Sequence, residues 1–413
     1  MLNALRMPAF FTGIPLAHPL RKLSWLCFLL GSSQLLGQSF VPGQSYYGTS
    51  QYIEYRAGNL PIIITAPHGG QLKPASIPDR NCSGCVTSRD LETDILAELF
   101  YDSLLAQTGC HPHVIINHLH RVKLDANRAL GEAANGNPEA QLAWQEFHDF
   151  VAHARDSLVK QYGKGLYIDL HGHGHSIQRL ELGYRLTSSK LRQNPEGLNE
   201  SSLVSSSSIR HLVGNNLGQL THAELLRGNQ SLGTLFENEN FPSVPSSNQP
   251  FPLSGEAYFS GGYNTERYGS SQGGTIDGVQ IECNYTGVRD NAANLQSFAG
   301  ASARVLPLFW EVHMFGQNAP TGSCLNPATP LEEALSARFA LYPNPTRDYL
   351  QMEFEQAFSG TLHLIDINGR VIRQQLLFMT TSYRWALGKL PSGWYSLQIE
   401  QEGKSWVKKI WVQ

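Results

Sequence analysis

Residues 61–70 have the sequence PIIITAPHGG, an apolar run followed by a histidine and two glycines. A short apolar run bounded by prolines is typical of a strand that is buried on both faces of a parallel sheet. Side chains at the carboxyl ends of such strands face the ligand crevice of an open α/β sheet. His68 is therefore predicted to lie at a binding site, and the glycines after it allow close approach of the backbone to a bound group.

A second predicted strand ends in the same way, because residues 166–170 lead directly into the sequence HGHGH at 171–175. His171 should share the sheet edge with His68, and Asp169, two residues earlier, points to the same face and could orient it. A catalytic zinc ion takes three protein ligands and keeps a fourth position for water. The two strand-end histidines supply two of these ligands, whereas His173 and His175 are interpreted as loop or substrate-lining residues.

Short apolar runs alternate with amphipathic stretches from about residue 52 to residue 315. This alternation predicts an α/β fold with a mixed, mostly parallel central sheet flanked by helices. Further strands are expected at 114–116 and 278–282, and helices at 91–104, 138–163 and 290–314. The helix at 91–104 should bury Leu91, Ile95, Leu96, Leu99, Phe100 and Leu104. The serine-rich stretch 201–208 and the segment 233–274 are predicted to be loops.

The end of the chain changes to the two-residue period of β-strands. Apolar and polar residues alternate at 349–354, 362–367, 394–399 and 407–412, with turn residues at 368–369 and 402–403. We therefore predict an all-β, immunoglobulin-like sandwich at 338–413 after a linker at 317–337. Its motifs are LYPNP at 341–345, IDINGR at 365–370, LPSGWY at 390–395 and a basic pair at 408–409.

These four motifs resemble the C-terminal sorting domain of the type IX secretion system. The resemblance implies recognition of the tail by the secretion translocon and passage across the outer membrane of a Gram-negative bacterium. It leaves open whether the tail is removed. The alternative is an ordinary carbohydrate-binding or adhesive β-sandwich.

The beginning of the chain also indicates export. Arg21 and Lys22 precede an apolar stretch at 23–36, which predicts a signal peptide at 1–38. The stretch is about 14 residues long, short of the roughly 20 that span a membrane. The mature chain is expected to be secreted or held at the outer cell surface. A net charge of −3 gives no basic field that would attract nucleic acid.

Cysteine usage fits an oxidising compartment. The predicted mature chain keeps an odd number of cysteines, so one thiol stays free or pairs unusually. They are Cys82, Cys85, Cys110, Cys283 and Cys324. For Cys82 and Cys85 a disulfide is favoured over a second zinc site or a redox pair, and it would hold the loop after His68 in place.

A set of motifs in the α/β region resembles the N-formylglutamate amidohydrolase family. In chain order they are HGG at 68–70, Asp90 with Thr93, Arg121 with DANR at 125–128, Asp169-x-His171, GGY at 261–263 with Tyr268-Gly269, and QIE at 280–282. The family is similar in fold to the zinc carboxypeptidases and the zinc-dependent poly-γ-glutamate hydrolases. The resemblance covers roughly residues 55–315 and implies a catalytic domain at 45–316.

The resemblance also implies roles for individual residues. His68, His171 and an acidic residue would bind one zinc ion. Asp90 is the preferred acid, and Glu92 and Asp94 stay open. Glu282 would act as the general base, and Arg121 would polarise the scissile carbonyl. Asn127 and Arg128 would bind a substrate carboxylate through the planar guanidinium, and Tyr263 would line the site. The alternative role for Asp90 is a helix cap; for Arg121, Arg128 and Glu282 it is ion pairing.

The predicted activity is hydrolysis of a C–N amide bond in a carboxylate-bearing N-acyl amino acid or peptide, by metal-activated water. N-formylglutamate itself is a doubtful substrate, because its breakdown is cytoplasmic and this chain carries export signals at both ends. The alternatives are a zinc carboxypeptidase or peptidoglycan amidase, and a non-catalytic cell-surface binding protein. Neither a nucleophilic-serine elbow nor a phosphate-binding Gly-Lys-Ser/Thr loop occurs in the sequence.

Overall fold

A computed structural model describes residues 40–316, 339–366, 370–401 and 404–413. The predicted signal peptide at 1–38 and the linker at 317–337 lie outside the described residues. Among the described helices, none is both long enough and apolar enough to cross a membrane.

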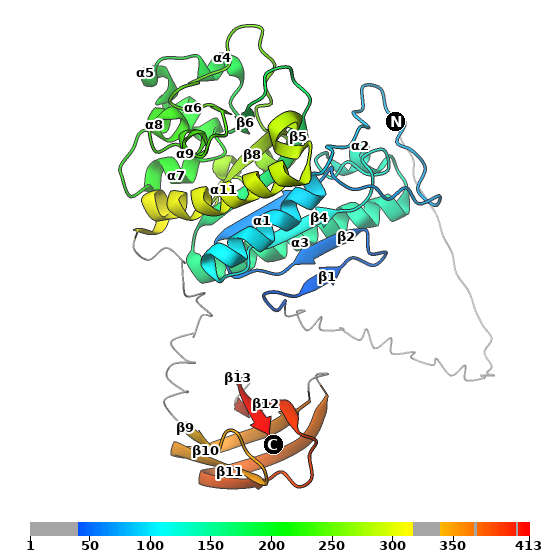
Figure 1. The fold of residues 1–413 in the computed structure, drawn as a ribbon, viewed down its shortest axis with the longest axis vertical. Coiled ribbons are helices and arrows are strands. Elements are labelled where there is room, and N and C mark those ends of the chain that lie inside the picture. Colours follow the sequence, from blue (N-terminus) through cyan, green and yellow to red (C-terminus); the bar gives the residue numbers. More distant parts are fainter. Residues whose placement is uncertain (1–39, 317–338, 367–369, 402–403) are drawn as a thin grey trace, which may run out of the picture. The chain divides into compact units, whose positions relative to one another are not determined.

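The first part of the chain is built on an eight-stranded sheet (Figure 1). Its strand order is β1-β2-β4-β3-β5-β8-β6-β7. The four central strands β4, β3, β5 and β8 pair in parallel, whereas β1, β2 and β6 join by antiparallel pairing. The prediction of a mixed, mostly parallel sheet is confirmed. The strands are β1 (Ser45–Tyr47), β2 (Ile53–Arg56), β3 (Ile62–Ala66), β4 (His113–Asn117), β5 (Gly165–His173), β6 (Leu180–Gly183), β7 (Ser243–Val244) and β8 (Ile276–Asn284).

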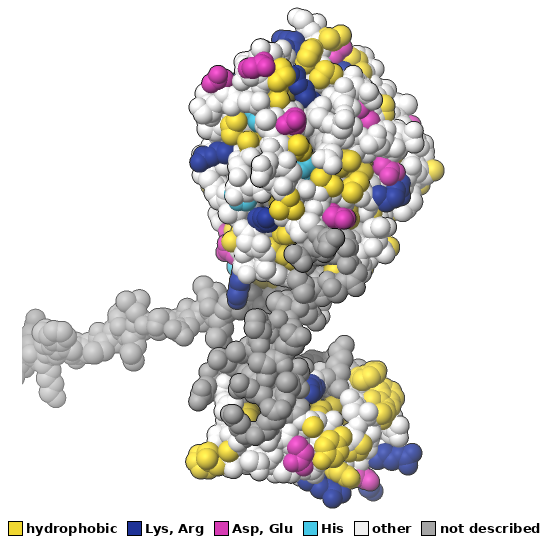
Figure 2. Space-filling model, turned by 90° about the vertical axis from the view of Figure 1, so that its left-hand side faces the viewer, with side chains coloured by type: hydrophobic (Ala, Val, Ile, Leu, Met, Phe, Trp, Pro, Cys, Tyr) yellow, Lys and Arg dark blue, Asp and Glu magenta, His cyan; other side chains and the backbone are white. Residues whose placement is uncertain are grey.

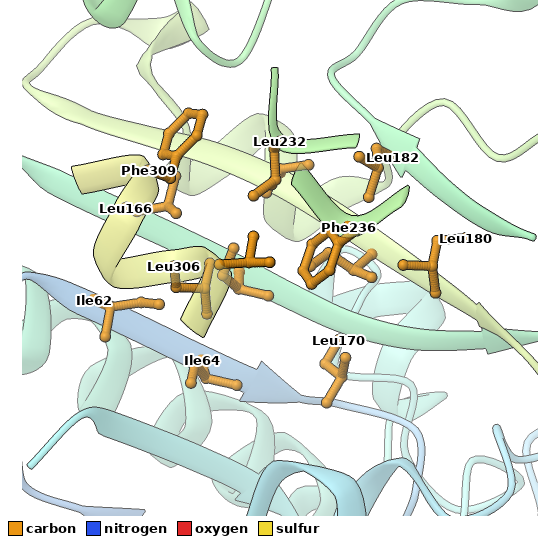
Figure 3. Close-up of a cluster of buried hydrophobic side chains, with 14 of the residues drawn as sticks. Ile62, Ile64, Leu166, Leu170, Leu180, Leu182, Leu232, Phe236, Leu306 and Phe309 are labelled. Atoms are coloured by element: carbon orange, nitrogen blue, oxygen red, sulfur yellow. The ribbon is translucent and has the colours of Figure 1, made fainter. Parts of the chain in front are cut away.

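Helices cover both faces of this sheet (Figure 1). Successive residues of β3 point to opposite faces: Ile62 and Ile64 pack in one hydrophobic cluster with residues of α1 (Thr93–Thr108) and α11 (Ala292–Trp310), and Ile63 packs in another with residues of α3 (Pro138–Tyr162). Because both faces are covered, the central strands are apolar almost throughout, as expected for buried parallel strands. Figure 3 shows part of the first cluster, in which Ile62, Ile64, Leu166 and Leu170 of the sheet pack with Leu306 and Phe309.

The helix boundaries follow local sequence signals. Helix α3 begins with Pro138 after Asn137, whose side chain accepts a hydrogen bond from the Ala140 amide. Both α1 and α3 end at glycines with positive φ, Gly109 (φ 71°) and Gly163 (φ 73°). The face of α1 was partly mispredicted, because Leu91 and Ile95 are exposed while Leu96, Phe100 and Leu104 are buried.

The two segments predicted as loops contain short helices and a short strand. They include α6 (Ser201–Ser206) in the serine-rich stretch and α9 (Leu232–Asn238), α10 (Tyr263–Tyr268) and β7 in the segment 233–274. These elements are too short for a periodic pattern, and tertiary packing decides them instead. Leu203 and Phe236 each insert into the common core. The remaining short elements are α2 (Leu130–Ala134), α4 (Ser188–Leu191), α5 (Pro195–Leu198), α7 (Arg210–Asn215), α8 (His222–Arg227), η1 (Ser270–Gln272), η2 (Tyr285–Arg289) and η3 (Glu311–Phe315).

Phe298 lies at the centre of the aromatic packing between α1, α9 and α11. Its ring is 5.5 Å from the rings of Phe100 and Phe236 and 4.9 Å from that of Phe241. We expect Phe298→Ala to lower the free energy of unfolding by about 3–5 kcal/mol, since it leaves a cavity in a closed core. Leu308→Ala on the same helix is the matched control, because Leu308 is 44% exposed. Urea unfolding followed by circular dichroism measures both, and equal effects would contradict this assignment of the core.

The C-terminal part is all β, as predicted. Its strands are β9 (Phe339–Tyr342), β10 (Tyr349–Ile365), β11 (Val371–Ala386), β12 (Gly393–Gln401) and β13 (Lys404–Val412). They pair in one antiparallel sheet in the order β11-β10-β12-β13, with β9 on β10. Register shifts along β10 and β11 accompany the curling of the sheet around a core that includes Leu362, Trp385 and Ile410.

Strand β11 was not predicted from the sequence. Its outward residues break the two-residue alternation, because Leu376, Phe378 and Met379 are 65–81% exposed. Figure 2 shows apolar side chains at the surface of the C-terminal part, beside Lys and Arg side chains.

Candidate active site

The three central strands β3, β5 and β8 bring the predicted metal and base residues together at their carboxyl ends. His68 follows β3 by two residues, and His171 lies near the end of β5. His171 pairs directly with Glu282 of β8 in the parallel register. All three side chains are buried, with at most 5% of each residue exposed. The convergence expected from strand ends is therefore present in the fold.

Asp90 joins the two histidines although it lies on the loop before α1. The His68 Nδ1 atom is 3.1 Å from His171 Nδ1, and Asp90 Oδ2 is 3.3 Å from the first and 3.0 Å from the second. The backbone fixes Asp90 there, because its amide donates to the His68 carbonyl and its own carbonyl accepts from the Thr93 hydroxyl. Glu92 and Asp94, both in the described part of the chain, lie outside this cluster.

These three distances fit a tetrahedral metal ion. Bonds of about 2.0–2.2 Å from zinc to nitrogen and oxygen place neighbouring ligand atoms about 3.3 Å apart. The observed separations of 3.0, 3.1 and 3.3 Å match the edges of one face of such a tetrahedron. Two imidazoles and one carboxylate are also the donor set of a catalytic zinc site that keeps one position for water.

A carboxylate behind each histidine holds its ring. Asp125 Oδ1 lies 2.6 Å from His68 Nε2, and Asp169 Oδ2 lies 2.9 Å from His171 Nε2. An ionised carboxylate only accepts, so each Nε2 carries the proton and donates it, which leaves a lone pair on Nδ1 when the ring is neutral. Both Nδ1 atoms therefore face Asp90 in the form that binds metal.

The role of Asp125 could not be recognised from the sequence. It occurs in the DANR motif, but nothing in its spacing from His68 indicates that the two side chains meet. Asp169 has its own support, because the Thr65 hydroxyl donates to Oδ1 at 2.8 Å and the Asn264 side chain donates at 3.4 Å. Thr65 lies three residues before the start of HGG, in a strand whose apolar pattern indicates only a structural role, so sequence reasoning missed it as well.

The electrostatics of the cluster favour a cation. Although burial opposes ionisation, the charges of His68 and His171 hold the pKa of Asp90 well below its ordinary value. Burial likewise acts to lower the pKa of His171, but the charge and hydrogen bond of Asp169, with Asp90, raise it well above its ordinary value. A site that stabilises positive charge on a buried imidazole also stabilises a bound metal cation.

Glu282 has the environment of a carboxyl group that exchanges protons near neutral pH. Burial raises its pKa to about 8, opposed by the charge of His171 and assisted by those of Asp90 and Glu181. Gln280, two residues earlier on the same strand face, donates from Nε2 to Glu282 Oε1 at 2.8 Å. Its own Oε1 accepts from the Gly262 amide at 2.7 Å, so Gln280 positions Glu282.

Arg121 and Asn127 lie within the cluster. Arg121 Nη1 donates to Asp90 Oδ1 at 3.4 Å, and its Nε donates to Asp125 Oδ2 at 3.0 Å. The Asn127 side chain lies 3.2 Å from His171 Nε2 and accepts from the Asn264 amide at 2.8 Å. The ion pairing foreseen as the alternative for Arg121 is present, and the residue also lines the pocket described below.

Arg128 and Tyr263 line the same pocket but do not contact the cluster of candidate metal ligands. Arg128 is half-buried and donates to Glu132 and to the Asn127 carbonyl. The Tyr263 hydroxyl accepts from Arg267 at 2.6 Å. Tyr268, which belongs to the same set of motifs, is buried away from the pocket lining, and its hydroxyl lies 2.5 Å from His148 Nδ1.

The cluster opens into a pocket of about 520 Å³. Three arginines line it together with the acids Asp90, Glu266 and Glu282 and with several aromatic residues. The lining residues are His68, Val86, Asp90, Arg121, Asn127, Arg128, His171, Gly172, Arg185, Tyr258, Phe259, Ser260, Gly261, Gly262, Tyr263, Glu266, Gln280 and Glu282. Arg185 has positive φ (66°), and its side chain donates to the Gly261 carbonyl and to Glu266. The pocket therefore offers cationic groups beside the candidate metal ligands.

The loop between His68 and Asp90 carries the predicted disulfide, which joins Cys82 to Cys85. Val86, the next residue, lines the pocket. Cys283 is a buried free thiol behind the pocket, and burial raises its pKa. Cys324 lies outside the described residues.

A second group of possible ligands consists of His173, His175 and Glu181. Hydrogen bonds within the protein already use both ring nitrogens of His173 and the Nδ1 atom of His175. His173 Nε2 lies 2.9 Å from the Arg179 carbonyl, and its Nδ1 accepts from the His175 amide at 3.1 Å. His175 Nδ1 lies 2.8 Å from Glu181. In the first cluster, by contrast, two Nδ1 atoms face each other and one carboxylate oxygen, an arrangement better completed by a cation than by protons.

A comparison with known protein families identifies the C-terminal part of the chain. Residues 340–413 match the secretion system C-terminal sorting domain. This match confirms the resemblance that the four C-terminal motifs indicated. No curated protein matches the chain in sequence.

Solved structures similar to the chain include two enzymes. One is N-formylglutamate amidohydrolase from Ralstonia eutropha JMP134, with 12% identity, a TM-score of 0.38, and coverage of 63% of this chain and 98% of that one. Another is succinylglutamate desuccinylase from Chromobacterium violaceum, with 10% identity, a TM-score of 0.29, and coverage of 85% and 96%.

Proposed function

We propose that the chain is an exported zinc-dependent hydrolase that cleaves a C–N amide bond in a carboxylate-bearing N-acyl amino acid or peptide. The observation that carries this proposal is the convergence of His68 Nδ1, His171 Nδ1 and Asp90 Oδ2 within 3.0–3.3 Å of one another. A zinc ion held by these atoms would act as a Lewis acid and supply a water molecule with a pKa near 7.

The remaining steps belong to side chains around the cluster. Glu282 accepts a proton from the attacking water and returns it to the leaving nitrogen, a role that suits a carboxyl group with a raised pKa. Arg121 stabilises the negative charge that develops on the carbonyl oxygen. Asn127 and Arg128 bind the substrate carboxylate, and Tyr263 helps to enclose it. Asp125 and Asp169 hold the two histidine rings in place.

Export is the second half of the proposal. The sorting-domain match at 340–413 supports delivery through a secretion machinery, with the C-terminal part as the segment that the machinery recognises. Together with the predicted signal peptide, it supports a location outside the cell or at its surface. The proposed domains are a catalytic unit at 45–316 and a sorting domain at 338–413.

A hydrolysis assay on a panel of substrates tests the proposal. The panel should contain N-formyl, N-acetyl and N-phenylacetyl amino acids, short peptides and peptidoglycan fragments. We expect cleavage of at least one class that bears a free carboxylate, loss of turnover with a chelator, and recovery on adding zinc. A zinc-free protein that cleaves none of these compounds would instead be a cell-surface binding protein. Release of C-terminal amino acids from peptides would identify a carboxypeptidase.

A further inference from the structure

Phe259 is an exposed aromatic side chain in the wall of the pocket. It is 43% exposed and lines the pocket together with the candidate metal ligands. A ligand that covers this exposed phenyl ring gains free energy by removing its apolar surface from water. Aromatic walls of this kind are common where a ligand presents an apolar face.

A buried carboxylate and a half-buried imidazole fix the position of this ring. The Phe259 amide donates to Glu181 Oε2 at 2.8 Å, and Glu181 Oε1 lies 2.8 Å from His175 Nδ1. The His175 ring stacks on the Phe259 ring with centroids 4.7 Å apart and planes inclined by 18°. The phenyl ring is thus supported from behind by an imidazole and held through its own backbone.

Burying Glu181 to hold the Phe259 ring costs free energy, which indicates that the fixed position of the ring has a function. Glu181 is fully buried (0% exposed), and a buried carboxylate costs free energy unless every oxygen has a partner. Both of its partners, His175 and the Phe259 amide, belong to this platform. A loop that needed no defined conformation would not require a buried acid to hold it.

The order of strands places the ring across the site from the carboxylate-binding residues. Arg121 and Arg128 belong to the segment that follows β4, while Glu181, which holds Phe259, lies on β6. Between β4 and β6 lie β3, β5 and β8, which position His68, His171 and Glu282. A substrate that places its carboxylate at Arg128 and its amide at His68 and His171 therefore extends its acyl half towards Phe259.

We propose that Phe259 selects substrates whose acyl half carries a flat ring, which stacks on the exposed face of the phenyl group. This inference rests on the proposed amide hydrolysis and names the substrate class of the same site. The pocket volume of about 520 Å³ falls in the range of about 300–1,000 Å³ in which proteins bind drug-sized ligands. It accommodates an aromatic acyl group in addition to an amino acid.

The test compares N-phenylacetyl and N-acetyl derivatives of the same amino acids, with the full-length protein. We expect the wild-type kcat/KM to be about tenfold higher for the phenylacetyl compounds, as for other apolar subsites. Phe259→Ala should remove this preference by lowering kcat/KM about tenfold more for the phenylacetyl compounds than for the acetyl compounds, whereas Phe259→Tyr should keep it. Leu253→Ala is the matched control, because Leu253 is 59% exposed on the same segment and does not line the pocket.

The possible outcomes separate this inference from the proposed function. Zinc-dependent cleavage of both compounds at equal rates would overturn the role of Phe259 and leave the hydrolase proposal intact. An equal loss on both compounds in Phe259→Ala would show a structural role only, and would also overturn the inference. A zinc-free wild-type protein that cleaves neither compound would overturn the proposed function itself. Zinc content measured for each variant shows that the site has stayed folded.

Discussion

Replacing Glu282 by Gln should lower kcat by about 10²–10⁴-fold and leave the bound zinc in place, since general-base catalysis contributes about this much. Glutamine keeps the shape of the side chain and still accepts the hydrogen bond that Gln280 donates. It cannot accept a proton at neutral pH. The change therefore removes the proposed chemistry with little effect on the fold.

The matched control for this variant is Glu266→Gln. Glu266 is another carboxylate that lines the pocket, but it pairs with Arg185 and lies outside the metal cluster. We expect it to lower kcat/KM less than about tenfold, in the range of a lost charged contact that is partly exposed to solvent. Steady-state kinetics and zinc analysis measure both variants. Wild-type turnover in Glu282→Gln would remove Glu282 from the mechanism.

Replacing His171 by Ala should abolish both zinc binding and hydrolysis. The variant removes one of three protein ligands and leaves the buried Asp169 carboxylate without its imidazole partner. The lost zinc should not return at micromolar metal, because the two remaining ligands cannot form a closed three-ligand site. Elemental analysis of the purified variant measures the zinc directly.

His175→Ala is the matched control, since it removes a histidine of the second group of possible ligands. We expect it to retain the zinc content of the wild type, because the His173, His175 and Glu181 group is satisfied by its own hydrogen bonds. Zinc loss in His175→Ala but not in His171→Ala would move the metal site to the second group. Circular dichroism shows whether each variant has folded.

The central strands and their ends could be predicted because buried parallel strands leave a strong local pattern. The apolar sequence PIIITA predicts β3, and a similar apolar run predicts β5. Because ligands bind at the carboxyl ends of such strands, His68 and His171 could then be predicted to lie close together. The short helices between residues 188 and 238 could not be predicted. Each spans only four to seven residues, which is too short for buried side chains such as Leu203 to give a periodic signal.

The side chains that hold the candidate metal ligands in place could not be predicted from the sequence, for a related reason. Asp125 meets His68 across 57 residues of chain, and Thr65 meets Asp169 across 104. Such contacts depend on how loops return over the sheet edge, which no local spacing encodes. Phe259 is a clearer case, because its importance depends on Glu181 and His175, which are far from it in the chain. The choice among Asp90, Glu92 and Asp94 also required the loop geometry, since all three acids precede or begin the same helix.

The most direct test of the account is a crystal structure of the purified protein with anomalous diffraction measured at the zinc edge. The account predicts one anomalous peak within about 2.0–2.2 Å of His68 Nδ1, His171 Nδ1 and an Asp90 carboxylate oxygen. Coordination through Nε2, a peak at His173, His175 and Glu181, or the absence of any peak from zinc-supplemented crystals would contradict it.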